Sequence, residues 1–149
     1  MLFRSEGAPI VCTGAGSGTH YIMANGLPLS SLAYASDTPL TVNNMLVSDL
    51  SRFVIAFGCN PIGTTAVDPM FIRWSDQESV ATWTPSVTNQ AGDYRLSQGS
   101  AIITAIQTRQ EILVWTDAAI YSMQYLGAPY VWGFQIMGSN TSKIGRAHV

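Results

Sequence analysis

The chain has 149 residues, enough for one domain with its own hydrophobic core. Apolar residues make up 47% of it and charged residues only 11%, whereas an average soluble domain carries about 25% charged residues. This composition argues against a disordered segment, and the scarcity of charge predicts a surface largely covered by other sheets or subunits. No apolar run is long enough to cross a bilayer, and the first residues lack the apolar stretch of a signal peptide, so we expect no membrane partner.

The first part of the chain alternates short apolar stretches with turn residues. Residues 9–13 (PIVCT) and 20–24 flank a glycine-rich link, and Asn25-Gly26 is a strong hairpin signal because both residues tolerate positive φ. Residues 27–32 are weakly strand-like. Residues 43–50 are the best helix candidate, but they are too few to alter the fold class.

The second part predicts strands more strongly. Residues 52–58 (RFVIAFG) are β-branched and aromatic, as in a buried strand, and residues 70–74 and 101–107 are similar. Residues 111–116 and 119–125 are separated by two residues, which fits a tight hairpin, and a last strand is expected at residues 130–136. Short strands at a spacing of roughly ten residues predict an all-β sandwich, barrel or propeller.

One phrase occurs twice. Residues 72–76 (IRWSD) return as residues 113–117 (LVWTD), with the two tryptophans 41 residues apart, and about 40–45 residues make one four-stranded propeller blade. In each copy the hydroxyl and the carboxylate can bond nearby backbone amides and so begin a turn. The alternative is two unrelated strands that end in ordinary turn residues. The candidate structural repeat consists of Trp74, Ser75, Asp76, Trp115, Thr116 and Asp117.

The two ends differ from the rest of the chain. The codons that encode IGRAHV, within residues 143–149, resemble the start of a common sequencing adapter, and residues 1–5 (MLFRS) resemble the complementary adapter read inward. We therefore expect residues 1–5 and 143–149 to be foreign and residues 6–142 to be an internal fragment of a longer protein. Residues 6–142 contain four arginines, nine acids and no lysine, which argues against direct, sequence-specific nucleic-acid binding.

Candidate cofactor and metal motifs are weak. Residues 13–18 (TGAGSG) follow an apolar stretch as a dinucleotide-binding loop would, but a strand and a turn are expected after them, so a hairpin link is the better interpretation. His20 lacks the partners of a catalytic base. Cys12 and Cys59 are far apart, and we expect free, buried thiols without a disulfide or a zinc site. We expect no cofactor.

Acids and aromatic residues offer the only enzymatic or ligand-binding alternatives. A glycosidase needs a pair of carboxylates, which these acids could supply. Asp76 with Glu78 could supply part of a calcium site. Turn formation is, however, the commoner role of acids in turn-like sequence. Tryptophans and tyrosines on strands are more often core or interface residues than a sugar-binding surface. We therefore expect no catalytic residues. The acids considered are Asp68, Asp76, Glu78, Asp93 and Asp117.

Several phrases together resemble tail-complex and neck proteins of tailed bacteriophages, in which a strand ending RWSDQ leads into W-T-P and an AG turn. Residues 111–125 (EILVWTDAAIYSMQY) are similar to the next blade of those proteins. The other matching phrases are residues 68–76 (DPMFIRWSD), Trp83-Thr84-Pro85, residues 89–92 (NQAG), 129–133 and 16–29.

The resemblance implies an all-β, partial β-propeller-like fold of about two to three truncated blades. It implies a structural, non-enzymatic component of the virion tail (nozzle, hub or neck), assembled in the bacterial host cytoplasm. Its partners would be other phage tail or neck proteins, in a homo-oligomeric ring when full length. A carbohydrate-binding or glycan-cleaving tail component that contacts the host surface is the alternative. In a tail tube, the acids would line a DNA conduit and repel phosphates.

Overall fold

The computed structural model describes residues 39–48, 50–79 and 82–138, together with the backbone of Ser139 and of four earlier strands. These parts contain strands and no helix, in three four-stranded sheets. Sheet A consists of β1 (Leu2–Ser5), β2 (Ala8–Cys12), β3 (His20–Ile22) and β4 (Ser30–Ser31). Sheet B consists of β5 (Val42–Ser48), β6 (Phe53–Cys59), β7 (Asp68–Trp74) and β8 (Gly92–Arg95). Sheet C consists of β9 (Ile102–Gln107), β10 (Ile112–Thr116), β11 (Ala119–Gly127) and β12 (Val131–Ser139).

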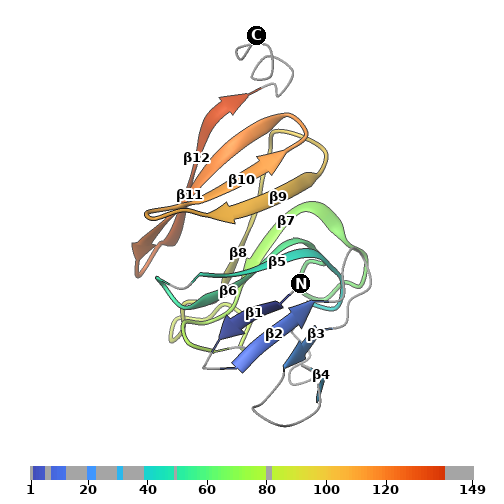
Figure 1. The fold of residues 1–149 in the computed structure, drawn as a ribbon, viewed down its shortest axis with the longest axis vertical. Helices are drawn as coiled ribbons and strands as arrows, with labels where there is room; N and C mark the ends of the chain where they lie inside the picture. Colours follow the sequence, from blue (N-terminus) through green and yellow to red (C-terminus); the bar gives the residue numbers. More distant parts are fainter. Residues whose placement is uncertain are drawn as a thin grey trace.

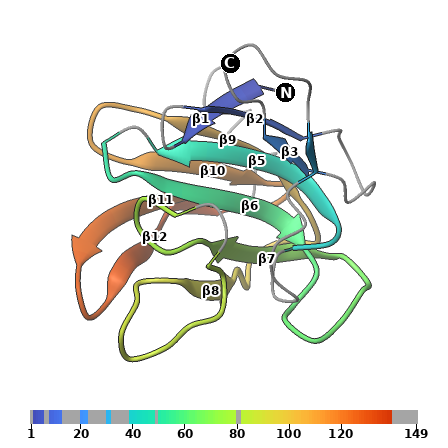
Figure 2. The same ribbon diagram turned by 90° about the horizontal axis from the view of Figure 1, so that it is seen from below.

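Each sheet is an antiparallel meander in which strands that are consecutive in the chain pair with one another. Figure 1 shows sheet B between sheet C above it and sheet A below it. The first strands of the sheets contact each other in turn, β1 with β5 and β5 with β9, and Figure 2 shows β1 and β2 beside β5. Successive four-stranded sheets whose first strands adjoin are the arrangement of propeller blades, so the predicted all-β, partial propeller-like fold is confirmed.

Sheets B and C share one hydrophobic core. Phe53, Ile55 and Phe57 of β6 point toward sheet C, because alternate residues of a strand face the same side. At the outer edge Tyr94 of β8 stacks on Phe134 of β12, with ring centroids 4.3 Å apart. The core therefore extends from the inner strands to the outer ones. Its other buried members are Met70, Ile72, Trp74, Leu96, Ile102, Ile112, Val114, Ala119, Tyr121, Met123, Val131 and Trp132.

The opposite face of sheet B is buried as well. Val54 and Ala56 of β6 pack there with Met45 and Val47 of β5 and with Trp83, which comes from the loop between β7 and β8. All seven residues of β6 are thus buried, which explains why this stretch is continuously apolar and not alternating.

Arg73 lies inside this second layer with 1% of its surface exposed. Its guanidinium carbon is 5.9 Å from the centroid of the Trp83 ring, and its Nη1 donates a hydrogen bond of 3.2 Å to the Asn60 carbonyl. A cation can remain in an apolar layer when an aromatic face and carbonyl oxygens replace water.

Most of the strand predictions are confirmed within one or two residues, including the tight hairpin between β10 and β11. The helix candidate at residues 43–50 is wrong, because Val42–Ser48 forms β5 and pairs with β6. Burial of Met45 and Val47 against a neighbouring strand outweighs the local pattern. The short edge strand β8 was not predicted, because Tyr94 is its only large apolar residue.

Gly92 allows the Trp74 ring to lie across the β7–β8 pair, where the two residues are cross-strand partners. A Cβ on Gly92 would stand 2.6 Å from Trp74 Cζ2, closer than real Cβ contacts. We predict that Gly92→Ala lowers the free energy of unfolding by about 1–3 kcal/mol through overpacking, measured by urea denaturation.

A Trp74→Phe background is the matched control, because it removes the ring atoms that the new methyl group would meet. Gly92→Ala should cost clearly less there than in the wild type. An equal loss in both backgrounds would show that the contact with Trp74 is not the cause.

Candidate functional site

The first candidate phrase closes the end of β7 onto the loop before β8. Ser75 Oγ accepts a hydrogen bond from the Val54 amide at 3.1 Å, and Asp76 Oδ1 accepts from the amides of Gln77 and Gln90, each at 2.9 Å. Trp74 Nε1 donates to the Gln90 carbonyl at 2.9 Å. The phrase thus ties together the two ends of the loop between β7 and β8, fourteen residues apart in the chain.

The second candidate phrase does the same for sheet C. Thr116 Oγ1 accepts from the Ala119 amide at 2.8 Å and donates to the Gln98 carbonyl at 2.8 Å. Asp117 Oδ1 accepts from the Ser100 amide at 2.7 Å, and Asp117 Oδ2 accepts from the Ser100 hydroxyl. These hydrogen bonds from Ser100 lower the pKa of the Asp117 carboxyl below its usual value.

The two phrases share turn chemistry but not a position in the sheets. Trp74 ends the third strand of sheet B and is buried in the shared core, whereas Trp115 lies on the second strand of sheet C and is half-buried. The first strands of the two sheets begin at Val42 and Ile102, sixty residues apart. The spacing of 41 residues between the tryptophans is therefore not the spacing of equivalent strands, although the predicted bonding of Ser75, Asp76, Thr116 and Asp117 to backbone groups is observed.

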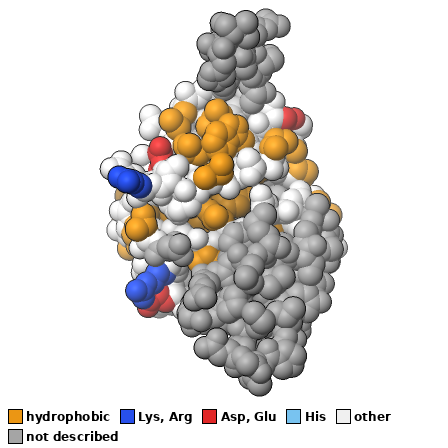
Figure 3. All heavy atoms as spheres, viewed as in Figure 1, with side chains coloured by type: hydrophobic (Ala, Val, Ile, Leu, Met, Phe, Trp, Pro, Cys, Tyr) orange, Lys and Arg blue, Asp and Glu red, His pale blue; other side chains and the backbone are white. Residues whose placement is uncertain are grey.

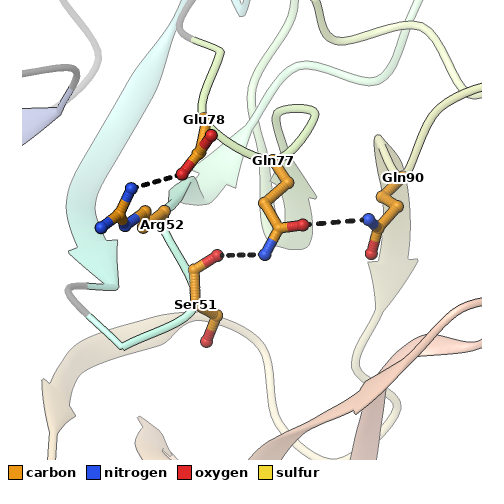
Figure 4. Close-up of polar contacts among 5 residues, drawn as sticks. All are labelled: Ser51, Arg52, Gln77, Glu78 and Gln90. Carbon is orange, nitrogen blue, oxygen red and sulfur yellow. Dashed lines mark hydrogen bonds and ion pairs between the residues drawn. The ribbon is translucent and has the colours of Figure 1, made fainter.

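A polar network, drawn in Figure 4, extends from the first phrase. Gln77 Nε2 donates to the Ser51 carbonyl at 2.9 Å, and Gln90 Nε2 donates to Gln77 Oε1 at 3.1 Å. Arg52 and Glu78 form an ion pair, and the Glu78 amide donates to the Arg52 carbonyl at 2.8 Å. Both of these residues have positive φ, 62° and 59°, a conformation that non-glycine residues hold only when their surroundings fix it.

The network reaches sheet C through Tyr125 of β11, whose hydroxyl donates to Gln90 Oε1 at 3.0 Å. The Tyr125 ring also packs against Phe53 and Trp132, each at a centroid distance of 5.5 Å. Sequence reasoning missed the role of the two glutamines. Gln77 directly follows residues 68–76, and Gln90 lies within residues 89–92, so both occur in turn-like sequence beside segments already singled out, but nothing in the sequence pairs them.

The acids considered as catalytic or calcium-binding residues are spread over the described structure. Asp68 pairs with Arg95 at 2.8 Å, Glu78 pairs with Arg52, and Asp76 and Asp117 bind turn amides. Asp93 is exposed on β8. No group of three metal-ligating side chains occurs among the described residues.

The hypothesis of an acid-lined conduit finds no support in this placement. In a propeller the first strand of each blade lies nearest the axis. Neither β5 nor β9 carries a charged residue, and the six acids of the described residues lie elsewhere.

Cys59 is a free, buried thiol, as predicted. Burial raises the pKa of this thiol to about 12, so it carries no charge at neutral pH. The side chains of Cys12 and His20 and the glycine-rich residues 13–18 lie outside the described residues. The flanking strands β2 and β3 pair antiparallel, as a hairpin link between them requires.

The outer face of sheet C, the side turned away from sheet B, is apolar along its first two strands. Leu113 and Trp115 of β10 alternate with inward-facing residues, and the exposed Ile103 and Ile106 lie beside them on β9. A hollow of about 360 Å³ is lined by Ile103, Thr104, Ile106, Trp115, Thr116 and Asp117. Figure 3 shows hydrophobic side chains gathered over the region that sheet C occupies in Figure 1.

The same face is polar along β11 and β12. A smaller hollow of about 170 Å³ is lined by Ser122, Gln124, Leu126, Gly133, Phe134 and Gln135. Ser122 and Gln124 both donate to the Glu111 carboxylate, and these hydrogen bonds lower the Glu111 pKa. The polar groups of this half thus largely satisfy one another.

Comparison with known proteins identifies no relative, because no family model, no curated protein and no solved structure matches the chain. Across the described residues, no helix has the length and apolarity needed to cross a membrane.

We predict that Cys59 resists alkylation in the folded protein, because the thiolate is the reactive form and burial disfavours it. Iodoacetamide at pH 8, followed by peptide mass spectrometry, should leave Cys59 unmodified in buffer and modify it fully in denaturant. Rapid modification of the native protein would contradict the buried position.

We predict that Asp117 makes stability depend on pH at the acid end. Its folded-state pKa is lowered, so the stabilisation is complete above the ordinary aspartate pKa and is lost as the pH falls through the lowered value. The difference in Tm between the wild type and Asp117→Asn should therefore be larger at pH 7 than at pH 3. The same difference at both pH values would mean that the charge on Asp117 contributes nothing.

Proposed function

We propose that the chain is a structural, non-enzymatic component of a phage tail complex, a nozzle, hub or neck, that works by assembly with other proteins. The observation that carries the proposal is the apolar half of the outer face of sheet C, with Ile103 61% exposed and Ile106 51% exposed beside a hollow. Contiguous apolar surface of this kind marks protein contact sites. The particular assignment to a phage tail rests on the sequence resemblance.

Two further features support assembly. Sheet B, the middle layer, has both of its faces buried by neighbouring elements, so the fold already stacks sheet on sheet. The outer face of sheet C continues that stack, and a further sheet or subunit can cover it in the same manner. Low charge fits this arrangement, since interface centres are poor in charged residues.

Long-read sequencing of the source DNA across both ends of the gene tests the phage assignment directly. We expect the reading frame to continue on both sides and to lie between portal-like and tail-like genes. The protein from the extended frame should form rings or tubes in negative-stain electron microscopy and should bind no glycan on an array. Glycan binding together with discrete monomers would favour the host-surface alternative, and unrelated neighbouring genes would refute the tail assignment.

A further inference from the structure

β12 is the outermost strand of sheet C and pairs with β11 along one edge. No strand in the described part of the chain pairs with its other edge. In an antiparallel sheet, alternate backbone N–H and C=O groups of such a strand point outward and can accept a further strand.

The three outer edges of the molecule differ in how well they discourage such pairing. β4, at the edge of sheet A, has two residues, and β8, at the edge of sheet B, has four, of which Asp93 and Arg95 are exposed and charged. Short length and charge are common devices against strand addition. β12 has nine residues with neither a charge nor a proline, and residues 132–136 pair with β11 without a register shift, so this segment is the edge that favours addition.

We propose that β12 pairs antiparallel with β12 of a second copy of this chain and joins two C sheets into one continuous eight-stranded sheet. This inference rests on the proposed assembly function and names one partner for it. Self-pairing about a two-fold axis makes the same strand both donor and acceptor, which is the usual closed arrangement of homodimers.

The sequence of β12 suits a copy of itself. Between two register shifts, Trp132, Phe134 and Ile136 alternate with Gly133 and Gln135 in regular pairing with β11. A two-fold axis perpendicular to the sheet places the apolar rows of both copies on one side and the glutamines on the other. No charge is brought together.

Two apolar side chains at the end of this segment are exposed in the monomer. Ile136 is 43% exposed and Met137 is 59% exposed, although both are apolar. Strand pairing covers them, and main-chain hydrogen bonds supply affinity in the manner of strand addition in peptide recognition.

Sedimentation velocity of the full 149-residue chain over a range of concentrations tests the pairing. We expect a dimer that weakens at least tenfold in Ile136→Lys and in Met137→Lys, because each lysine occurs twice at a two-fold contact. Val87→Lys, on an exposed loop between β7 and β8, is the matched control and should leave the dimer unchanged. Retained protection of Cys59 from alkylation shows that each variant is folded.

Hydrogen exchange of the wild type locates the contact without any substitution. Amides of β12 should gain protection as the protein concentration rises, whereas those of β8 should not, and a synthetic peptide of residues 131–139 should compete with the dimer. A monomer at all concentrations, or a dimer insensitive to both lysine variants, overturns the inference. A dimer that Trp115→Glu weakens and the lysine variants do not would place the contact on the outer face of sheet C, which overturns the edge pairing and leaves the assembly function standing.

Discussion

The apolar layer between sheets B and C is the constraint on which the rest of the described structure depends. Fifteen buried residues from both sheets form it, and β6 lies at its centre with every side chain removed from water. Burying a large apolar side chain contributes about 1.5–3 kcal/mol, so a layer of this size outweighs any single loop contact. Since β6 must be covered on both faces, sheet B becomes the middle layer, and the loop that carries Trp83 folds back over its second face.

Loops are then fixed by hydrogen bonds to backbone amides more than by ion pairs. Asp76 accepts the Gln90 amide from the far end of its own loop, and Asp117 accepts the Ser100 amide from the loop between β8 and β9. Gln90 also links its loop to Tyr125 on sheet C. The exposed pair of Arg52 with Glu78 adds little by comparison, because surface ion pairs are worth roughly 0–1 kcal/mol. With 11% charged residues, the chain relies on hydroxyl, amide and carboxylate acceptors close to backbone donors.

Sequence reasoning succeeded where one strand pattern dominates. Residues 52–58 and 111–125 were predicted as strands because their apolar and β-branched residues do not follow a helical repeat. β6, β10 and β11 lie there. It failed at β5, where Asn43 and Asn44 interrupt the strand pattern and only pairing with β6 decides the conformation. It also misjudged the repeat as one propeller blade. A short sequence match predicts the hydrogen bonds of a turn, but it does not predict which strand of a sheet precedes that turn. The hydrogen bond between Gln77 and Gln90 joins the two ends of one loop, thirteen residues apart, a pairing that no local pattern encodes.

The surface groups that are used neither in the core nor in the loop hydrogen bonds indicate which functions are open to the protein. Most of the described acids are used to hold turns or to pair with arginine, and the buried Cys59 thiol carries no charge. The outer face of sheet C and the edge of β12, by contrast, keep apolar side chains and backbone groups that the described residues do not cover. Groups that could do chemistry are largely engaged within the fold, while groups that could bind another sheet are available. That distribution is the physical basis of the assembly function proposed above.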